Sequence, residues 1–164
     1  MLPGIAISIT LIAAALLVVA GVHTARTPNA VIGALAAQRL RVAPGVARGF
    51  GVMQVVVGAG VFGGSRVAIA ATGGLYCAFA VFVARAARRR TSCGCLGNAR
   101  TPARPHHAVL DAALAAGSFA ALAVEVPSIG PLPAIAFLSL VVIGAFLAAE
   151  LVGGLAQPAE RAVG

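Results

Sequence analysis

Long apolar stretches alternate with short polar connections along the chain, and this pattern predicts membrane-spanning helices. The apolar stretches cover residues 2–22, 50–64, 67–84, 108–126 and 134–151. A helix needs about 20 predominantly apolar residues to cross the hydrocarbon core of a bilayer, and most of these runs approach that length. The pattern therefore predicts an all-α fold: a polytopic membrane helical bundle of about five transmembrane helices, with residues 1–164 forming a single integral membrane domain.

Two of these stretches and one connecting segment carry further information. Residues 2–22 contain no charge, and a cleaved signal peptide is the alternative to a retained helix; the run has no basic residues before it and exceeds the usual apolar length of about 7 to 15 residues, which favours retention. Residues 29–43 are more polar and carry Val31, Ile32 and Leu35, which predicts a short interfacial helix on the membrane surface. The run 50–64 is rich in glycine, which predicts close packing against a neighbouring helix.

Composition supports the membrane interpretation and makes the lipid bilayer the first expected partner. The chain is 60% hydrophobic and 10% charged, and it contains neither Lys nor Trp. A soluble globular domain rarely has such a composition. The net charge of +8 comes from arginines, which serve as topology anchors against anionic lipid, so the charge requires no nucleic acid partner.

The arginines are distributed unevenly between the two sides of the predicted membrane. The connections 23–49 and 85–107 and the C-terminal tail hold all of them except Arg66. Short loops rich in arginine stay on the cytoplasmic side. This predicts a multi-pass protein of the plasma membrane with the loop 88–107 at the cytoplasmic face.

That loop contains the main candidate for chemistry, the sequence Cys93-Gly94-Cys95. Gly94 provides the backbone freedom that such a small disulfide ring demands, and strain in the ring raises its tendency to accept electrons. Positive charge favours thiolate over thiol, and the loop supplies it through Arg88, Arg89, Arg90, Arg100 and Arg104. We expect Cys93 and Cys95 to act as a redox pair; two unconnected loop cysteines are the alternative.

Other polar residues near the loop have competing interpretations. Cys93, Cys95, His106 and His107 form an alternative zinc or copper ligand set, although one residue between the cysteines is fewer than zinc sites usually have. His107 is a candidate for proton transfer because histidine changes charge near neutral pH. Asp111 either complements the positive N-terminus of its helix or acts as a proton acceptor or an arginine partner.

Two residues inside the predicted spans have less specific signals. Cys77 lies near the middle of the third span, far from the loop, so we expect a buried small hydrophobic residue, with a resolving role in disulfide exchange as the alternative. Gln54 in the second span is expected to form a hydrogen bond between helices.

The third apolar run ends in basic residues, and it is followed by Cys93-Gly94-Cys95-Leu96-Gly97 and a new helix near His107. This order of features resembles the methylamine-utilisation protein MauE family, which is related to DoxX-like redox-associated membrane proteins. In that family an aromatic residue usually occupies the position of Leu96, and a Glu commonly occupies that of Gln54. The resemblance implies a helical membrane protein that assists disulfide formation or maturation of a partner protein. The namesake acts on the methylamine dehydrogenase small subunit, often beside a thioredoxin-like protein.

The resulting hypothesis is a membrane redox accessory protein with a general rather than methylamine-specific role. A thioredoxin-like protein is the expected partner and a quinone is a candidate electron acceptor; no cofactor is certain, and homo- or hetero-oligomer formation and intrinsic thiol-disulfide oxidoreductase activity are left open. A non-catalytic membrane scaffold or metal-binding subunit is the second hypothesis. The predicted cytoplasmic loop contrasts with substrates of disulfide formation, which lie outside the cell, so the direction of electron flow also stays open.

Overall fold

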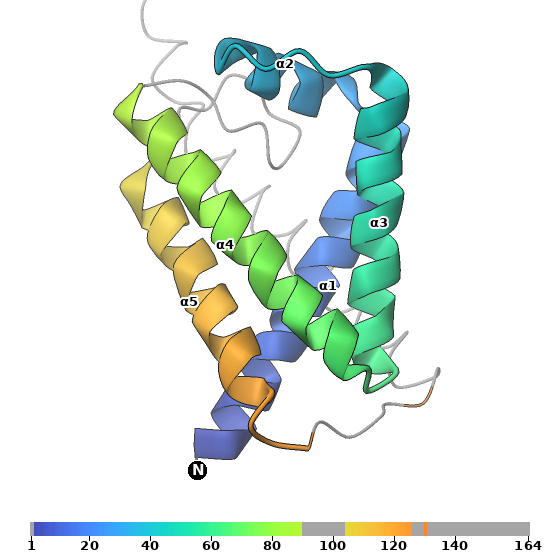
Figure 1. Cartoon of the computed structure of the whole chain (residues 1–164), viewed down its shortest axis with the longest axis vertical. Coiled ribbons are helices and arrows are strands. Elements are labelled where there is room, and N and C mark those ends of the chain that lie inside the picture. The colour runs from blue at the N-terminus through green and yellow to red at the C-terminus, as the bar shows by residue number, and fades with distance from the viewer. Residues whose placement is uncertain (1, 90–103, 126–129, 131–164) are drawn as a thin grey trace, which may run out of the picture. The chain divides into compact units, whose positions relative to one another are not determined.

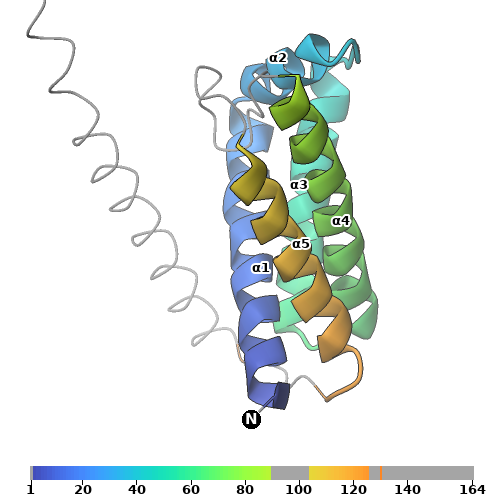
Figure 2. The same cartoon turned by 90° about the vertical axis from the view of Figure 1, so that its left-hand side faces the viewer.

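The computed structural model describes residues 2–89, 104–125 and 130, and its side chains from residue 3 onward. Its elements are, in chain order, α1 (Leu2–Arg26), α2 (Asn29–Ala37), α3 (Pro44–Phe62), α4 (Arg66–Arg88) and α5 (Pro105–Ala121). Residues 1–129 form one compact unit and residues 130–164 a second, of which only Gly130 is described. The described part is all-helical, with four long helices packed side by side and α2 lying across one end of the bundle (Figures 1 and 2).

Local sequence explains where the helices begin and end. Proline occupies the first turn of both α3 and α5, where the missing backbone N–H costs no hydrogen bond. The backbone amide of Ala68 donates to the Ser65 hydroxyl at 3.3 Å, which caps the start of α4. Gly64 has a φ of 74°, a left-handed conformation that allows the tight turn between α3 and α4.

The helices differ at their ends from the predicted segments. α1 continues to Arg26, four residues past the predicted 22, because no helix breaker precedes Pro28. α3 begins at Pro44 rather than 50, and α5 at Pro105 rather than 108, because charged residues are tolerated in a helix end that reaches the membrane surface. The predicted fifth span, 134–151, lies outside the described residues, so the prediction of a single domain over 1–164 stays a prediction.

Helices α1 and α3 pack closely through glycine, as the glycine-rich second run predicts. A Cβ atom placed on Gly51 would lie 2.7 Å from the Gly21 carbonyl oxygen and 2.7 Å from the Ala25 amide nitrogen. One placed on Gly58 would lie 2.7 Å from the Ala14 carbonyl oxygen. Higher residue numbers on α3 thus meet lower numbers on α1, so the two helices are antiparallel and in backbone contact.

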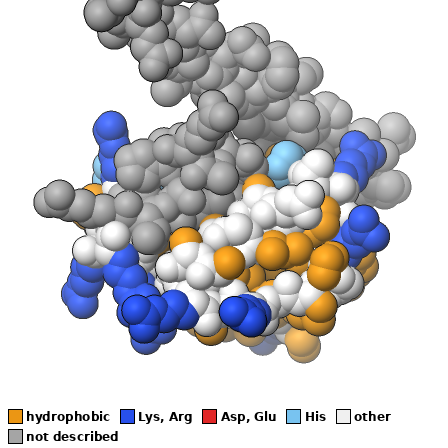
Figure 3. Space-filling model, turned by 90° about the horizontal axis from the view of Figure 1, so that it is seen from above, with side chains coloured by type: hydrophobic (Ala, Val, Ile, Leu, Met, Phe, Trp, Pro, Cys, Tyr) orange, Lys and Arg blue, Asp and Glu red, His pale blue; other side chains and the backbone are white. Residues whose placement is uncertain are grey.

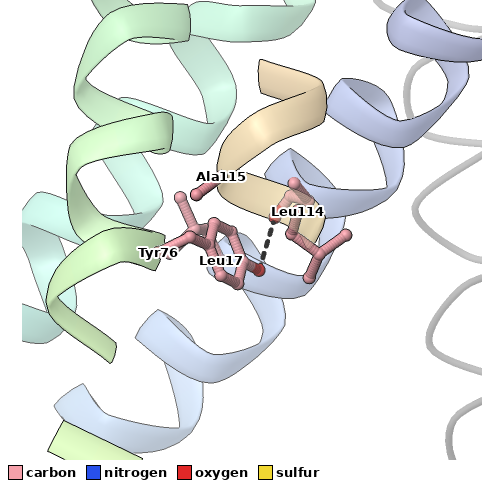
Figure 4. Close-up of a cluster of buried hydrophobic side chains, with 5 residues drawn as sticks. Leu17, Tyr76, Leu114 and Ala115 are labelled. Atoms are coloured by element: carbon pink, nitrogen blue, oxygen red, sulfur yellow. Dashed lines mark hydrogen bonds between the residues drawn. The ribbon is translucent and has the colours of Figure 1, made fainter. Parts of the chain in front are cut away.

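The second close packing joins α5 to α1 and α4. Gly73 of α4 accommodates the Phe119 ring, and Gly117 of α5 accommodates the Ile9 side chain. A buried cluster occupies the space among the three helices; Figure 4 shows four of its members labelled, and the full set is Ala13, Leu17, Tyr76, Leu114 and Ala115. This cluster lies inside the bundle and fixes α5 antiparallel to both neighbours.

Three described helices, α1, α3 and α4, are long and apolar enough to cross a membrane. The described α5 has 17 residues and packs among them, at the lower limit of a spanning length. Large hydrophobic side chains are exposed on the outside of the bundle, among them Ile5, Val56 and Val109. An all-α, polytopic membrane bundle is therefore confirmed as the fold class.

Candidate functional site at the arginine-rich end

One end of the bundle collects most of the described positive charge. The C-termini of α1 and α4, the N-termini of α3 and α5, and α2 meet there; we call it the arginine-rich end. Seen from above this end, arginines lie along the left, lower and right edges of the described surface, and no described acidic side chain appears in the view (Figure 3). Its exposed arginines are Arg26, Arg39, Arg41, Arg48, Arg85, Arg88, Arg89 and Arg104, whereas Arg66 begins α4 at the opposite end.

Helices α4 and α5 bring both borders of the candidate redox loop to this end. Val83 and Ala86 of α4 are buried, and Ala108 of α5 packs against them. Arg89 follows α4 as its C-cap, and Arg104 precedes α5 as its N-cap. The connection between them starts and finishes beside the positive N-terminus of α5, which is a favourable place for a thiolate.

The predicted redox residues divide into described and undescribed groups. Cys93, Cys95, Arg90 and Arg100 lie outside the described residues, so their roles stay predictions. Arg88, Arg89 and Arg104 are exposed at the borders of the loop. The described structure thus places three of the five expected thiolate-stabilising arginines at one end of the bundle.

His106 and His107 lie in the first turn of α5 at the same end. Their rings contact edge to face, with centroids 4.4 Å apart and an interplanar angle of 79°. His106 is exposed and His107 is half-buried. Among residues 2–89 and 104–125, no group of three or more metal-binding side chains occurs; the alternative metal set includes Cys93 and Cys95, which those ranges do not contain.

Asp111 is half-buried in the second turn of α5. Because α5 begins at Pro105, earlier than predicted, Asp111 lies beyond the first turn, where interaction with the helix dipole fades. Its carboxylate interacts electrostatically with the Tyr76 hydroxyl of α4. The role of Asp111, as a partner of the helix N-terminus, a proton acceptor or an arginine partner, stays a prediction.

Tyr76 is the central residue that sequence reasoning missed. Its hydroxyl donates a hydrogen bond of 3.0 Å to the Ala13 carbonyl oxygen of α1, and Figure 4 shows it beside Leu17 and Leu114. Its ring also contacts Phe79 edge to face, with centroids 5.7 Å apart. The available sequence signal was that the chain has a single tyrosine, placed inside an apolar run.

Gln54 is buried in α3 and faces α1 near Gly21. Its Oε1 atom has no hydrogen-bond partner in the described structure. Among the described residues, the expected helix-to-helix hydrogen bond is therefore not formed through this oxygen. An amide oxygen left unpaired in a low-dielectric interior carries an energetic cost.

The expectation that Cys77 is buried is wrong. The side chain is exposed on the outer surface of α4. The buried stripe of α4 contains Ile69, Thr72, Tyr76 and Val83. Cys77 follows Tyr76 by one residue, about 100° around the helix, so it points away from the bundle core.

Comparison with known proteins adds one finding. The family model described as methylamine utilisation protein MauE matches residues 2–125, which include all five described helices. Neither the curated proteins nor the solved structures gave a match.

Proposed function

Because this chain belongs to the methylamine utilisation protein MauE family and is a membrane protein, we propose that it is a thiol-disulfide redox accessory protein of the plasma membrane. In this proposal Cys93 and Cys95 form the redox pair and assist disulfide formation or maturation of a partner protein. One observation carries the proposal: Arg89 and Arg104, the two residues that border the cysteine-bearing connection, both lie at the arginine-rich end.

The proposed reaction is a two-electron exchange between dithiols and disulfides. When Cys93 and Cys95 join, their two S–H bonds are lost, and two electrons and two protons leave. A disulfide of a thioredoxin-like partner takes them up and becomes a dithiol, or a quinone takes them up and becomes a quinol. The reverse direction uses the same groups, so the local chemistry suits either a donor or an acceptor role.

The described residues have defined contributions in this scheme. Arg88, Arg89 and Arg104 favour the thiolate that attacks a disulfide, and the N-terminus of α5 adds to their effect. His107 and Asp111 are proposed to carry protons between the cysteines and the interior of the bundle. The negative charge of Asp111 also acts on the Tyr76 hydroxyl further inside the bundle.

The decisive experiment follows the redox state of a thioredoxin-like partner protein in reconstituted vesicles. The protein without Cys77, Cys77→Ser, is expected to exchange at the wild-type rate, whereas Cys93→Ser and Cys95→Ser variants lose exchange. Exchange at the wild-type rate in the double variant Cys93→Ser, Cys95→Ser would reject the proposal.

Topology needs a separate measurement, because arginine placement predicts a cytoplasmic loop. A membrane-impermeant maleimide applied to intact cells is expected to leave Cys93 and Cys95 unlabelled. The Cys77→Ser background removes the exposed thiol of α4 from the readout. Strong labelling from outside would place the redox pair on the opposite face and reverse the predicted topology.

A further inference from the structure

An exposed pair of arginines, Arg26 and Arg48, lies where α1 and α3 reach the arginine-rich end. Val22 precedes Arg26 by four residues on α1, and Arg48 precedes Val52 by four residues on α3, so each valine shares a helix face with its arginine. Val22 is 38% exposed and Val52 is 55% exposed. Both arginines are exposed as well. These two faces therefore point away from the bundle core.

The two faces also lie on the same side of the α1–α3 pair. Val22 directly follows Gly21, and Val52 directly follows Gly51. Each of these glycines contacts the other helix. One residue corresponds to a rotation of about 100°. On each helix, the residue after the contacting glycine is therefore rotated by the same angle away from the line where the helices touch. Because the two helices are antiparallel, this rotation leads to the same side of the pair on both helices. The two valines therefore form one continuous apolar surface.

Arg26 and Arg48 lie at the same level of this surface. Arg26 directly follows Ala25, whose amide nitrogen lies 2.7 Å from a Cβ built on Gly51. Arg48 precedes Gly51 by three residues, less than one helical turn of about 5 Å. Two guanidinium groups therefore project from neighbouring, closely packed helices, with exposed valines one turn further into the membrane.

We propose that Arg26 and Arg48 bind the phosphate group of an anionic phospholipid whose acyl chains lie along Val22 and Val52. The guanidinium fork pairs with phosphate oxygens in a bidentate manner, and neither α1 nor α3 contains an acidic residue to neutralise the arginines. The apolar surface directly below the charges favours a lipid over an acidic protein, because the lipid headgroup pairs with the arginines while its acyl chains cover the valines. This site is independent of the redox chemistry.

The test is a titration of the full-length protein with phosphatidylglycerol or phosphatidylcholine, read by native mass spectrometry. One arginine at the headgroup level strengthens binding of anionic lipid about fivefold, so Arg26→Gln, Arg48→Gln is expected to weaken binding of the first phosphatidylglycerol about 30-fold. Phosphatidylcholine binding is expected to change little. Equal loss for both lipids, or no loss for either, overturns the proposal.

A matched variant removes the same charge from the same end, at the connection between α2 and α3 rather than from the faces of α1 and α3 that carry Val22 and Val52. Arg39→Gln, Arg41→Gln is expected to weaken the first phosphatidylglycerol less than about threefold, because only diffuse attraction is lost. Equal effects of the two double variants would mean that no specific site exists. If the first variant does not fold, Arg26→Lys, Arg48→Lys carries the test: it keeps the charge, loses the fork, and is expected to bind with intermediate affinity.

Two competitors distinguish the lipid from other anions. Inorganic phosphate at millimolar concentration is expected not to displace phosphatidylglycerol, because it gains nothing from the valine surface. A polyglutamate peptide is likewise expected to compete poorly. If phosphate or polyglutamate fully displaces phosphatidylglycerol from the wild-type protein but not from the Arg26→Gln, Arg48→Gln variant, the arginines bind a soluble anion or an acidic protein. That result would overturn the lipid assignment.

Discussion

The glycine contact between α1 and α3 gives the sharpest test of how the bundle is held together. Replacing Gly51 with Ala places a Cβ atom 2.7 Å from the Gly21 carbonyl oxygen and the Ala25 amide nitrogen. Ordinary contact begins at 3.4 Å, so the helices must separate by about 0.7 Å. Both obstructing groups are backbone, and neither can rotate away.

The size of the effect follows from the lost packing. A gap of roughly 0.5–1 Å removes about a quarter to a half of the van der Waals attraction across it, and overpacking of this kind costs about 2–3 kcal/mol. Alanine regains about 0.5–1 kcal/mol through its better helix propensity. We therefore expect Gly51→Ala to lower the free energy of unfolding by about 1–2.5 kcal/mol.

Gly49 supplies the matched control on the same helix. It is exposed, and a Cβ atom built there meets nothing within 4 Å. Gly49→Ala is expected to raise the free energy of unfolding by about 0.5–1 kcal/mol through helix propensity alone. Chemical unfolding of both variants in detergent, followed by circular dichroism, measures the difference. Changes of the same sign and size would refute the glycine-contact reasoning.

Four further outcomes follow from the buried and polar residues. Tyr76→Phe keeps the aromatic packing but loses the hydrogen bond to Ala13, so unfolding in detergent should show a loss of about 1 kcal/mol; no loss would discount that bond. Gln54→Leu should gain about 1 kcal/mol in the same assay by removing an unpaired oxygen, and a loss would reveal a partner for it. Cys77→Ser should change neither stability nor exchange by more than a small margin, because the thiol is exposed; a lost exchange rate would restore its resolving role. Asp111→Asn should slow thiol exchange about 100-fold in stopped-flow measurements if it moves protons, while an unchanged rate assigns it a structural role.

Hydropathy and helix signals in the sequence were sufficient to predict the fold class and the close packing of the glycine-rich run 50–64 against a neighbouring helix. Leucine-, valine- and alanine-rich stretches identify α1 and α4, and glycines such as Gly51 and Gly58 indicate a tight helix contact. The helix ends were less predictable, because Arg48 and the histidines of α5 look like loop residues in sequence but reach the membrane surface from within a helix.

The side-chain environment inside the bundle was harder to predict. Cys77 and Tyr76 are neighbours in an apolar run, and only the packing of α4 against α1 and α5 decides that the tyrosine is buried and the cysteine exposed. The interaction of Asp111 with Tyr76 likewise joins two helices whose pairing a single sequence does not specify. The cysteine motif lies outside the described residues, so its redox chemistry stays a prediction that rests on three consecutive residues of the sequence.

The proposed function depends on a redox cycle in which Cys93 and Cys95 alternate between dithiol and disulfide. It is tested most directly by equilibrating the Cys77→Ser protein across a series of thiol-disulfide redox buffers and alkylating the free thiols before mass spectrometry. We expect one cooperative two-electron transition, in which both cysteines become unreactive together and the protein loses the mass of two hydrogens. Two cysteines that stay fully alkylated in the most oxidising buffer would contradict it.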